Sequence, residues 1–223
     1  MIESKSQVES QGRFQRQAKY SGLPLITLST HRLFNFVSVK GTGKAYQTAI
    51  DFIAIDDENK PKREHHFLTF GGDPGRGKTH LALGIGWHWL YNNMGIVLYF
   101  RAEQLLDVLR KEYDESSRNR IDRPSISELE FTQKVGLLIL DDLGAEKVSE
   151  WAIAKLDELI DYRYINELPT VFTTNLLLTQ LPQRIGSRLR EGTTVLLDGL
   201  DYREYKARMR KVKTRENTKD MVR

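Results

Sequence analysis

A glycine-rich loop at residues 71–80, "GGDPGRGKTH", has the residue types and spacing that point most directly to chemistry. Gly72, Gly77, Lys78 and Thr79 fit the pattern G-x-x-x-x-G-K-[ST]. Glycines let successive backbone N–H groups turn inward toward anionic oxygens, and a helix N-terminus after the loop adds positive charge. The loop (a Walker A motif) therefore predicts a phosphate site, and its expected contact residues are Gly72, Asp73, Pro74, Gly75, Arg76, Gly77, Lys78, Thr79 and His80.

The two polar residues at the end of the loop have separate expected tasks. Lys78 is expected to reach the β- and γ-phosphates of ATP, and the Thr79 hydroxyl is expected to bind Mg²⁺. A second stretch, "KGTGKAYQ" at residues 40–47, also contains a G-x-G-K. It has Ser38 where the first glycine would stand and Ala45 where the metal-binding hydroxyl would stand. We therefore interpret it as a turn that caps a helix.

Two further polar groups follow apolar strands. "LLILDD" ends in Asp141, placed to hold Mg²⁺ through water, and Asp142, placed to orient or deprotonate the attacking water. "VFTTN" ends in Asn175, whose amide can touch both the γ-phosphate and the water. Ligands gather at the carboxyl ends of strands in open α/β sheets, which favours a functional Asn175 over a simple strand-ending turn residue.

Three arginines stand in "RIGSRLREG", residues 184–192. One of them could act as an arginine finger that neutralises charge on the γ-phosphate. Arg184 and Arg190 are better explained as solvated side chains on an amphipathic helix.

The elements that must position these groups alternate along the chain. Apolar runs predict strands at 66–71, 95–100, 135–142, 170–175 and 193–199. Helical periodicity predicts helices at 45–55, 78–91, 102–113, 124–133 and 149–166. Such alternation predicts an α/β fold with a parallel sheet covered on both faces. We divide the chain into an N-terminal arm and packing segment (1–44, a candidate partner contact), a core (45–200) and a basic tail (201–223).

Composition limits the class of protein. The 223 residues include no cysteine, so disulfides and thiolate metal sites are excluded. No apolar run is long enough to span a membrane and no signal peptide is recognisable, so we expect a cytoplasmic protein. The net charge is +4, and residues 202–223 alone contribute about +6. That tail is either a solvated, frayed end or a contact for nucleic-acid phosphates.

Five segments together resemble a known family: "GGDPGRGKTHLALGIG", "LLILDDLG", "VFTTNL", "IGSRLREG" and "LDGLDYR". They come in the order and spacing of the DnaC-type helicase loaders, AAA+ ATPases closely related to the IstB transposition helper ATPases. The resemblance covers about residues 30–203. It implies a P-loop NTPase of AAA+ type with a five-stranded parallel sheet and no sizeable C-terminal lid domain. It also implies a sensor at Asn175, a nucleotide-sensing Arg203, and an ATP-dependent homo-oligomer in which Arg188 enters the next subunit's site.

The resemblance implies an ATPase that loads a replicative helicase and contacts single-stranded DNA. "DDLG" rather than "DELG" favours loaders over transposition helpers. Two alternatives stay open: an IstB-like helper that delivers a transposase to DNA, and a nucleotide-dependent adaptor with little turnover. Loaders commonly have a separate N-terminal helicase-binding domain, which the short, cysteine-free region here does not match. For "RLFNF" (32–36) two roles are open: the stretch helps to enclose the adenine, or it packs in the hydrophobic core.

Overall fold

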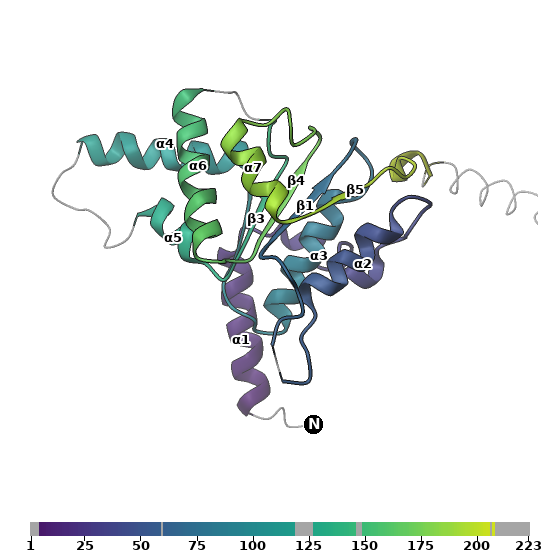
Figure 1. Ribbon diagram of the computed structural model, residues 1–223. Coiled ribbons are helices and arrows are strands. Elements are labelled where there is room, and N and C mark those ends of the chain that lie inside the picture. Colours follow the sequence, from purple (N-terminus) through teal and green to yellow (C-terminus); the bar gives the residue numbers. More distant parts are fainter. Residues whose placement is uncertain (1–4, 59, 119–126, 146–148, 206, 208–223) are drawn as a thin grey trace, which may run out of the picture.

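The computed structural model describes residues 5–58, 60–118, 127–145, 149–205 and 207. Within them, one sheet contains five parallel strands in the order β2-β3-β4-β1-β5 (Figure 1). The strands are β1 (Phe67–Gly71), β2 (Val97–Arg101), β3 (Leu137–Asp141), β4 (Thr170–Thr174) and β5 (Thr193–Leu196). The predicted five-stranded parallel sheet is confirmed, with strands that are shorter than expected by up to three residues at an end.

The central strands are buried on both faces. Every residue of β1, β3 and β4 is buried, which explains why their sequences are continuous apolar or threonine-rich runs without alternation. β4 lies between β1 and β3, so the strand before the glycine-rich loop and the strand before the two acids are not neighbours. Their carboxyl ends nevertheless open on the same edge of the sheet.

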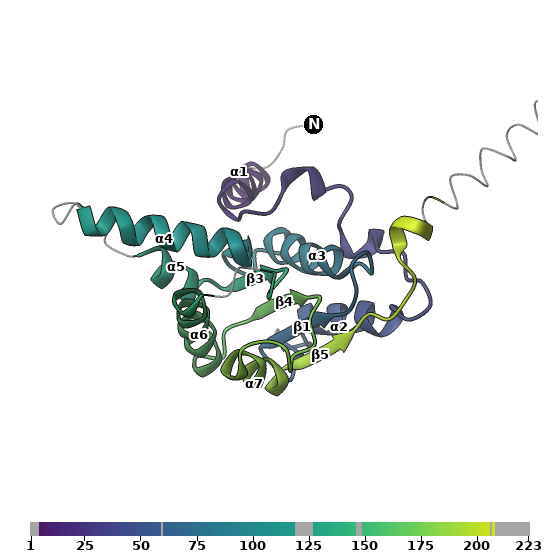
Figure 2. The same ribbon diagram turned by 90° about the horizontal axis from the view of Figure 1, so that it is seen from above.

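Helices cover the two faces in separate layers (Figures 1 and 2). The first layer contains α1 (Lys5–Tyr20), α2 (Gly43–Ile53) and α3 (Lys78–Tyr91). The second contains α4 (Ala102–Arg118), α5 (Glu128–Lys134), α6 (Glu150–Ile165) and α7 (Gln183–Glu191). α3 is apolar on nearly all sides because it lies between the sheet and the N-terminal segment.

Three local predictions need comment. The predicted packing segment contains two short 3₁₀ turns, Leu25–Thr27 and Leu33–Asn35, and the second contacts α3. The expected helix start at Pro124 lies outside the described residues, and α5 begins after Ser127, whose hydroxyl accepts a bond from the Glu130 N–H. The turn at residues 40–42 leads directly into α2, as predicted.

The described residues contain neither a lid domain after β5 nor a helix that could cross a membrane. After β5 they include one helical turn at residues 202–205 and no lid domain. No helix among them is both long and apolar enough to cross a membrane.

A buried arginine joins three elements. Arg163, on the inward face of α6, is fully buried, and burial lowers the pKa of its guanidinium to about 9, so it stays charged at neutral pH. Its partners, at 2.7–3.2 Å, are the carbonyls of Thr132, Gln133, Val135 and Pro169 and the hydroxyl of Thr170. The arginine thereby connects α6 with the end of α5 and the entries to β3 and β4.

We expect Arg163→Met to lower the free energy of unfolding by about 3–5 kcal/mol, because it leaves several buried carbonyls without donors. Urea denaturation measures the change. Lys155→Met on the same helix removes a cation with a partly exposed ion pair to Glu158, and it should cost less than about 1 kcal/mol. Equal losses in the two variants would contradict the structural role of Arg163.

Candidate functional site

The glycine-rich loop occupies residues 72–77, between β1 and α3. Gly72 and Gly77 have φ angles of 123° and 97°, which only glycine adopts without strain. A Cβ on Gly72 would lie 2.4 Å from the Leu197 carbonyl oxygen, and one on Gly77 would lie 2.8 Å from the Phe36 ring. The loop can therefore curl tightly enough for its N–H groups to surround an anion.

Lys78 begins α3 and is almost fully buried. Its Nζ donates to the carbonyls of Gly72 and Asp73 at 2.6 and 2.8 Å and to Oδ1 of Asn175 at 2.7 Å. Burial lowers the pKa of Lys78, against the opposing effect of nearby carboxylates, first Asp142. The Lys78 ammonium is thus held at the loop, and its N–H groups can donate to phosphate oxygens in place of these carbonyls.

Asp141 ends β3 and is buried, so its carboxylate needs hydrogen-bond donors. Thr79 donates to it at 2.9 Å, the Tyr99 hydroxyl at 2.8 Å and the Thr173 hydroxyl at 2.6 Å. Burial and the adjacent carboxylate raise the pKa of Tyr99, which keeps its hydroxyl protonated as a donor. Three elements therefore hold this carboxylate in one orientation.

Asp142 turns out of the strand. Its φ is 57°, in the left-handed region, and its N–H donates to the Thr173 hydroxyl at 2.9 Å. The turn brings its carboxylate to 3.5 Å from Nδ2 of Asn175, whose Oδ1 accepts from Lys78. Asp142, Asn175 and Lys78 thus form one connected polar group from the ends of β3, β4 and the loop.

A cleft of about 560 Å³ lies over these groups. The sequence-predicted residues that line it are Pro74, Gly75, Arg76, Gly77, Lys78, Thr79, His80, Asp141, Asp142, Asn175 and Arg203. Gly72 and Asp73 are not part of this lining, and their carbonyls accept hydrogen bonds from Lys78. The chain's fold thus gathers residues from four distant segments at one edge of the sheet.

The N-terminal segment forms another wall of the cleft. Phe36 lines it and stacks on Tyr46, with ring centroids 5.6 Å apart and planes 3° apart. Leu33, in the same "RLFNF" stretch, is buried in the core. The two interpretations of this stretch therefore apply to different residues: Leu33 has the core position and Phe36 faces the cleft. Thr42, from the competing glycine–lysine stretch, borders the same cleft.

Three polar residues that adjoin Asp141 were not predicted. Tyr99 and Thr173 hold Asp141, and Arg101, paired in register with Asp141 at the end of β2, lines the cleft. Thr173 stands two residues before Asn175 in "VFTTN", and Arg101 directly follows an apolar run. Their positions near the carboxyl ends of predicted strands could have indicated a place at the site.

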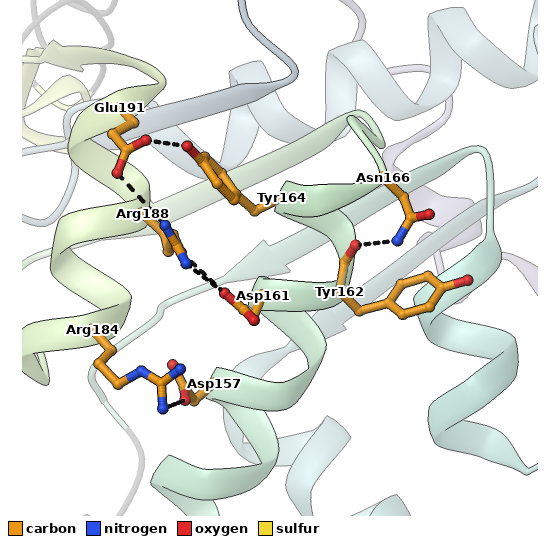
Figure 3. Close-up of polar contacts among 8 residues, drawn as sticks. All are labelled: Asp157, Asp161, Tyr162, Tyr164, Asn166, Arg184, Arg188 and Glu191. Atoms are coloured by element: carbon orange, nitrogen blue, oxygen red, sulfur yellow. Dashed lines mark hydrogen bonds and ion pairs between the residues drawn. The ribbon is translucent and has the colours of Figure 1, made fainter.

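Arg188 lies outside this cleft, on α7 (Figure 3). Its Nε and Nη2 donate to Oδ1 of Asp161 at 3.0 and 2.9 Å, and its guanidinium lies 4.3 Å from the centre of the Tyr164 ring. One turn earlier Arg184 pairs with Asp157 at 3.1 Å, and it is largely exposed, as predicted. Arg188 therefore contacts α6 and does not line the cleft of its own chain.

The donors at the cleft suit a hard divalent cation. Thr79 and Asp141 offer only oxygen atoms, which Mg²⁺ prefers. Among the residues that the structure describes, no group of three or more His, Cys, Asp or Glu side chains could hold a metal. A cation at Thr79 and Asp141 would accordingly complete its shell with phosphate and water oxygens. His65 and His66 lie by a different pocket, with His66 3.5 Å from Glu167.

The comparisons identify the family. The model of the IstB-like ATP binding proteins matches residues 61–219, more than two thirds of the chain. The chain belongs to the IstB-like ATP-binding family. This IstB-like chain is also similar in fold to a solved structure of the DnaC helicase loader, with a TM-score of 0.64, 25% identity, and coverage of 77% of this chain and 98% of that one. The P-loop fold of AAA+ type is thereby confirmed.

Two curated relatives represent the two branches that the sequence suggested. Over 144 residues the IstB-like chain is 27% identical to the replicative helicase loader DnaC of Buchnera aphidicola (subsp. Acyrthosiphon pisum), covering 62% of this chain and 56% of that protein. Over 125 residues it is 33% identical to the ATP-binding protein of insertion sequence IS1162 from Pseudomonas fluorescens, covering 56% and 48%. The chain spans about half the length of the curated relatives that it matches.

We expect Gly77→Ala to weaken ATP binding at least tenfold, because the new Cβ strains a left-handed backbone and pushes against Phe36. Titration with a fluorescent ATP analogue measures the affinity. Gly43→Ala is the matched control from the competing glycine–lysine stretch, since its Cβ would make only an ordinary 3.5 Å contact with Ser38. Normal affinity in Gly77→Ala would contradict the assignment of the loop.

Proposed function

We propose that this chain is an ATP-hydrolysing loader of a replicative helicase that contacts single-stranded DNA. One observation supports the catalytic part: Lys78, Asp141, Asp142 and Asn175 come from the start of α3 and the ends of β3 and β4, and they meet in one hydrogen-bonded group at one cleft. Their chemistry is that of phosphate binding, metal binding and water activation.

ATP would lie along the cleft with its phosphates at the glycine-rich loop. Lys78 would exchange the Gly72 and Asp73 carbonyls for β- and γ-phosphate oxygens. Phe36 offers an aromatic wall for the adenine, and Arg203 lines the cleft, as a nucleotide-sensing residue would. Thr79 and Asp141 would hold Mg²⁺, which supplies charge neutralisation at the phosphates.

Hydrolysis needs a water in line with the γ-phosphorus. Asp142 would accept a proton from that water. The water oxygen would form a bond to the γ-phosphorus while the bond between the γ-phosphorus and the β–γ bridging oxygen breaks. Asn175 lies between Asp142 and Lys78 and would hold the water and the γ-phosphate in register. The products are ADP and inorganic phosphate.

Arg188 would complete the site of a neighbouring subunit in a homo-oligomer. Its place outside the chain's own cleft supports this role. To reach a phosphate it would have to leave Asp161, an exchange that a partly exposed ion pair permits because such pairs are worth only about 1 kcal/mol or less.

We expect Arg188→Ala to lower ATP turnover per subunit by tenfold or more at high protein concentration, since an arginine finger is worth orders of magnitude in rate. Steady-state phosphate release over a range of protein concentrations measures this effect. Arg184→Ala removes the equivalent residue one turn earlier on α7 and should keep the wild-type rise with concentration. Turnover that is linear in protein concentration and unchanged in Arg188→Ala would contradict the trans-arginine role.

Two kinds of client protein are supported by the relatives. Similarity to DnaC loaders and "DDLG" support a helicase, whereas the higher identity to the IS1162 protein supports a transposase. The arm at residues 1–44 is the proposed partner contact, and the basic tail at 201–223, nearly all of it outside the described residues, is a candidate DNA contact. An adaptor that barely hydrolyses ATP is the third possibility.

We expect the immobilised full chain to retain the replicative helicase of its host in the presence of ATP and to retain less without it. Parallel pull-downs with the helicase and with a transposase separate the two clients. Lys78→Ala, which cannot engage the phosphates, provides the nucleotide-independent control. Retention of transposase alone would replace the loader by the transposition helper, and negligible phosphate release by the wild type would favour the adaptor.

A further inference from the structure

Acidic residues are missing from two long stretches of the chain. Asp and Glu make up 30 of the 223 residues, yet none occurs at residues 10–50 or 74–102. At the average frequency of the chain, about nine would be expected in stretches of this combined length. The same stretches contain nine Lys and Arg residues, of which Lys78 and Arg76 belong to the glycine-rich loop.

The two stretches pack together on one face of the sheet (Figure 2). The first contains most of α1, both 3₁₀ turns and most of α2, and the second contains α3 and β2. Phe14 of α1 contacts Trp87 and Tyr91 of α3, and the Trp87 indole donates to the Thr27 hydroxyl at 3.0 Å. The two acid-free stretches of the sequence therefore lie side by side in the fold, and the acids of this layer are at their borders, Glu9 in α1 and Asp51 in α2.

Four cations of this layer lie on its solvent side, and Arg32 is half-buried among them. Arg13, Arg16 and Lys19 are exposed and follow one another at a spacing of three residues along α1, and Arg32 follows in the same segment. Among the described residues, none of these four forms an ion pair. Several cations of the opposite layer are paired instead: Arg110 with Asp107, Lys134 with Glu130, and Lys155 with Glu158. The two faces of the sheet thus have different electrostatic character.

Exposed aromatic rings accompany these cations. Tyr20, Phe34 and Tyr91 are 73%, 77% and 65% exposed. Each has a cation beside it: Lys19 is 5.7 Å from the centre of the Tyr20 ring, and Arg32 is 5.9 and 4.9 Å from those of Phe34 and Tyr91. Rings that offer faces for stacking next to solvated cations are typical of surfaces that bind single strands.

We propose that this face, the α1–α3 face, binds single-stranded nucleic acid. Arg13, Arg16, Lys19 and Arg32 contact phosphates, and the rings of Tyr20, Phe34 and Tyr91 stack on bases. A duplex would satisfy the cations but hides its bases from the rings, so the rings select the single strand. The inference rests on the proposed DNA contact and deepens it, since it names the surface that the strand follows.

The face also borders the ATP cleft. The carbonyl of Arg32 lies 3.1 Å from Nε2 of His80 in the first turn after the loop, and Phe36, four residues later, lines the cleft. A strand bound at Arg32 and a nucleotide bound at Phe36 therefore act on one short segment. This proximity provides a physical route by which ATP changes the affinity for the strand.

The charge test compares two triple variants of the full chain that lose the same charge. Arg13→Gln/Arg16→Gln/Lys19→Gln removes cations from the α1–α3 face, and Arg110→Gln/Lys134→Gln/Lys155→Gln removes paired cations from the opposite layer. Fluorescence anisotropy with a labelled oligothymidylate, repeated over several salt concentrations, measures the dissociation constant. We expect roughly tenfold or more weakening in the first variant only, with a salt slope reduced by about two.

The ring test uses Tyr20→Ala/Phe34→Ala, which removes two exposed rings without emptying the core. We expect about fivefold or more weaker binding of the oligothymidylate with an unchanged salt slope, because stacking does not release counterions. Binding to a duplex of the same length should not change. Circular dichroism of each variant shows that the fold is retained.

The outcomes separate this inference from the proposed function. A wild-type chain that binds no single strand, with or without ATP, overturns both the DNA contact and the inference. Wild-type binding that is equally strong in the α1 triple variant and in the opposite-layer control overturns the inference alone. Duplex binding as tight as single-strand binding, or no effect of the ring variant, overturns the stacking role of Tyr20 and Phe34.

Discussion

The site depends on the burial of one carboxylate. Asp141 lies at the end of β3 with almost no access to water, and such a group is stable only when donors surround it. Those donors come from β2, β4 and the first turn of α3, so the strand order β2-β3-β4 is what allows Tyr99 and Thr173 to flank the acid. Thr79 reaches it from the helix that follows the glycine-rich loop, which fixes the loop relative to the sheet.

The N-terminal segment also forms part of the cleft. The predicted boundary at residue 44 separates Phe36 and Thr42 from the core, yet both line the same cleft as Lys78. The segment packs along α3, and its carbonyl at Arg32 contacts His80. The part of the chain proposed to contact a partner is thus in direct contact with the part proposed to hold the nucleotide.

The two faces of the sheet divide the charges between them. In the layer of α4 to α7, several cations are paired with acids, and Arg188 is held by Asp161 beside Tyr164 (Figure 3). In the layer of α1 to α3, Arg13, Arg16 and Lys19 form no ion pair among the described residues, and the acid nearest to them in sequence is Glu9, one turn before Arg13 on α1. A cation that is already paired must leave its acid before it can bind another anion, whereas an unpaired cation can bind the phosphates of a nucleic acid directly.

Local sequence by itself determined the glycine-rich loop, the acids after β3 and the five apolar strands, because each depends on neighbouring residues and on a short-range period. Only the tertiary structure decided that Tyr99 and Thr173 hold Asp141, that Phe36 faces the cleft, and that Arg163 joins three elements. Those contacts connect residues up to 42 positions apart in the case of Tyr99 and Asp141. They follow from strand order and helix packing, which no local pattern specifies.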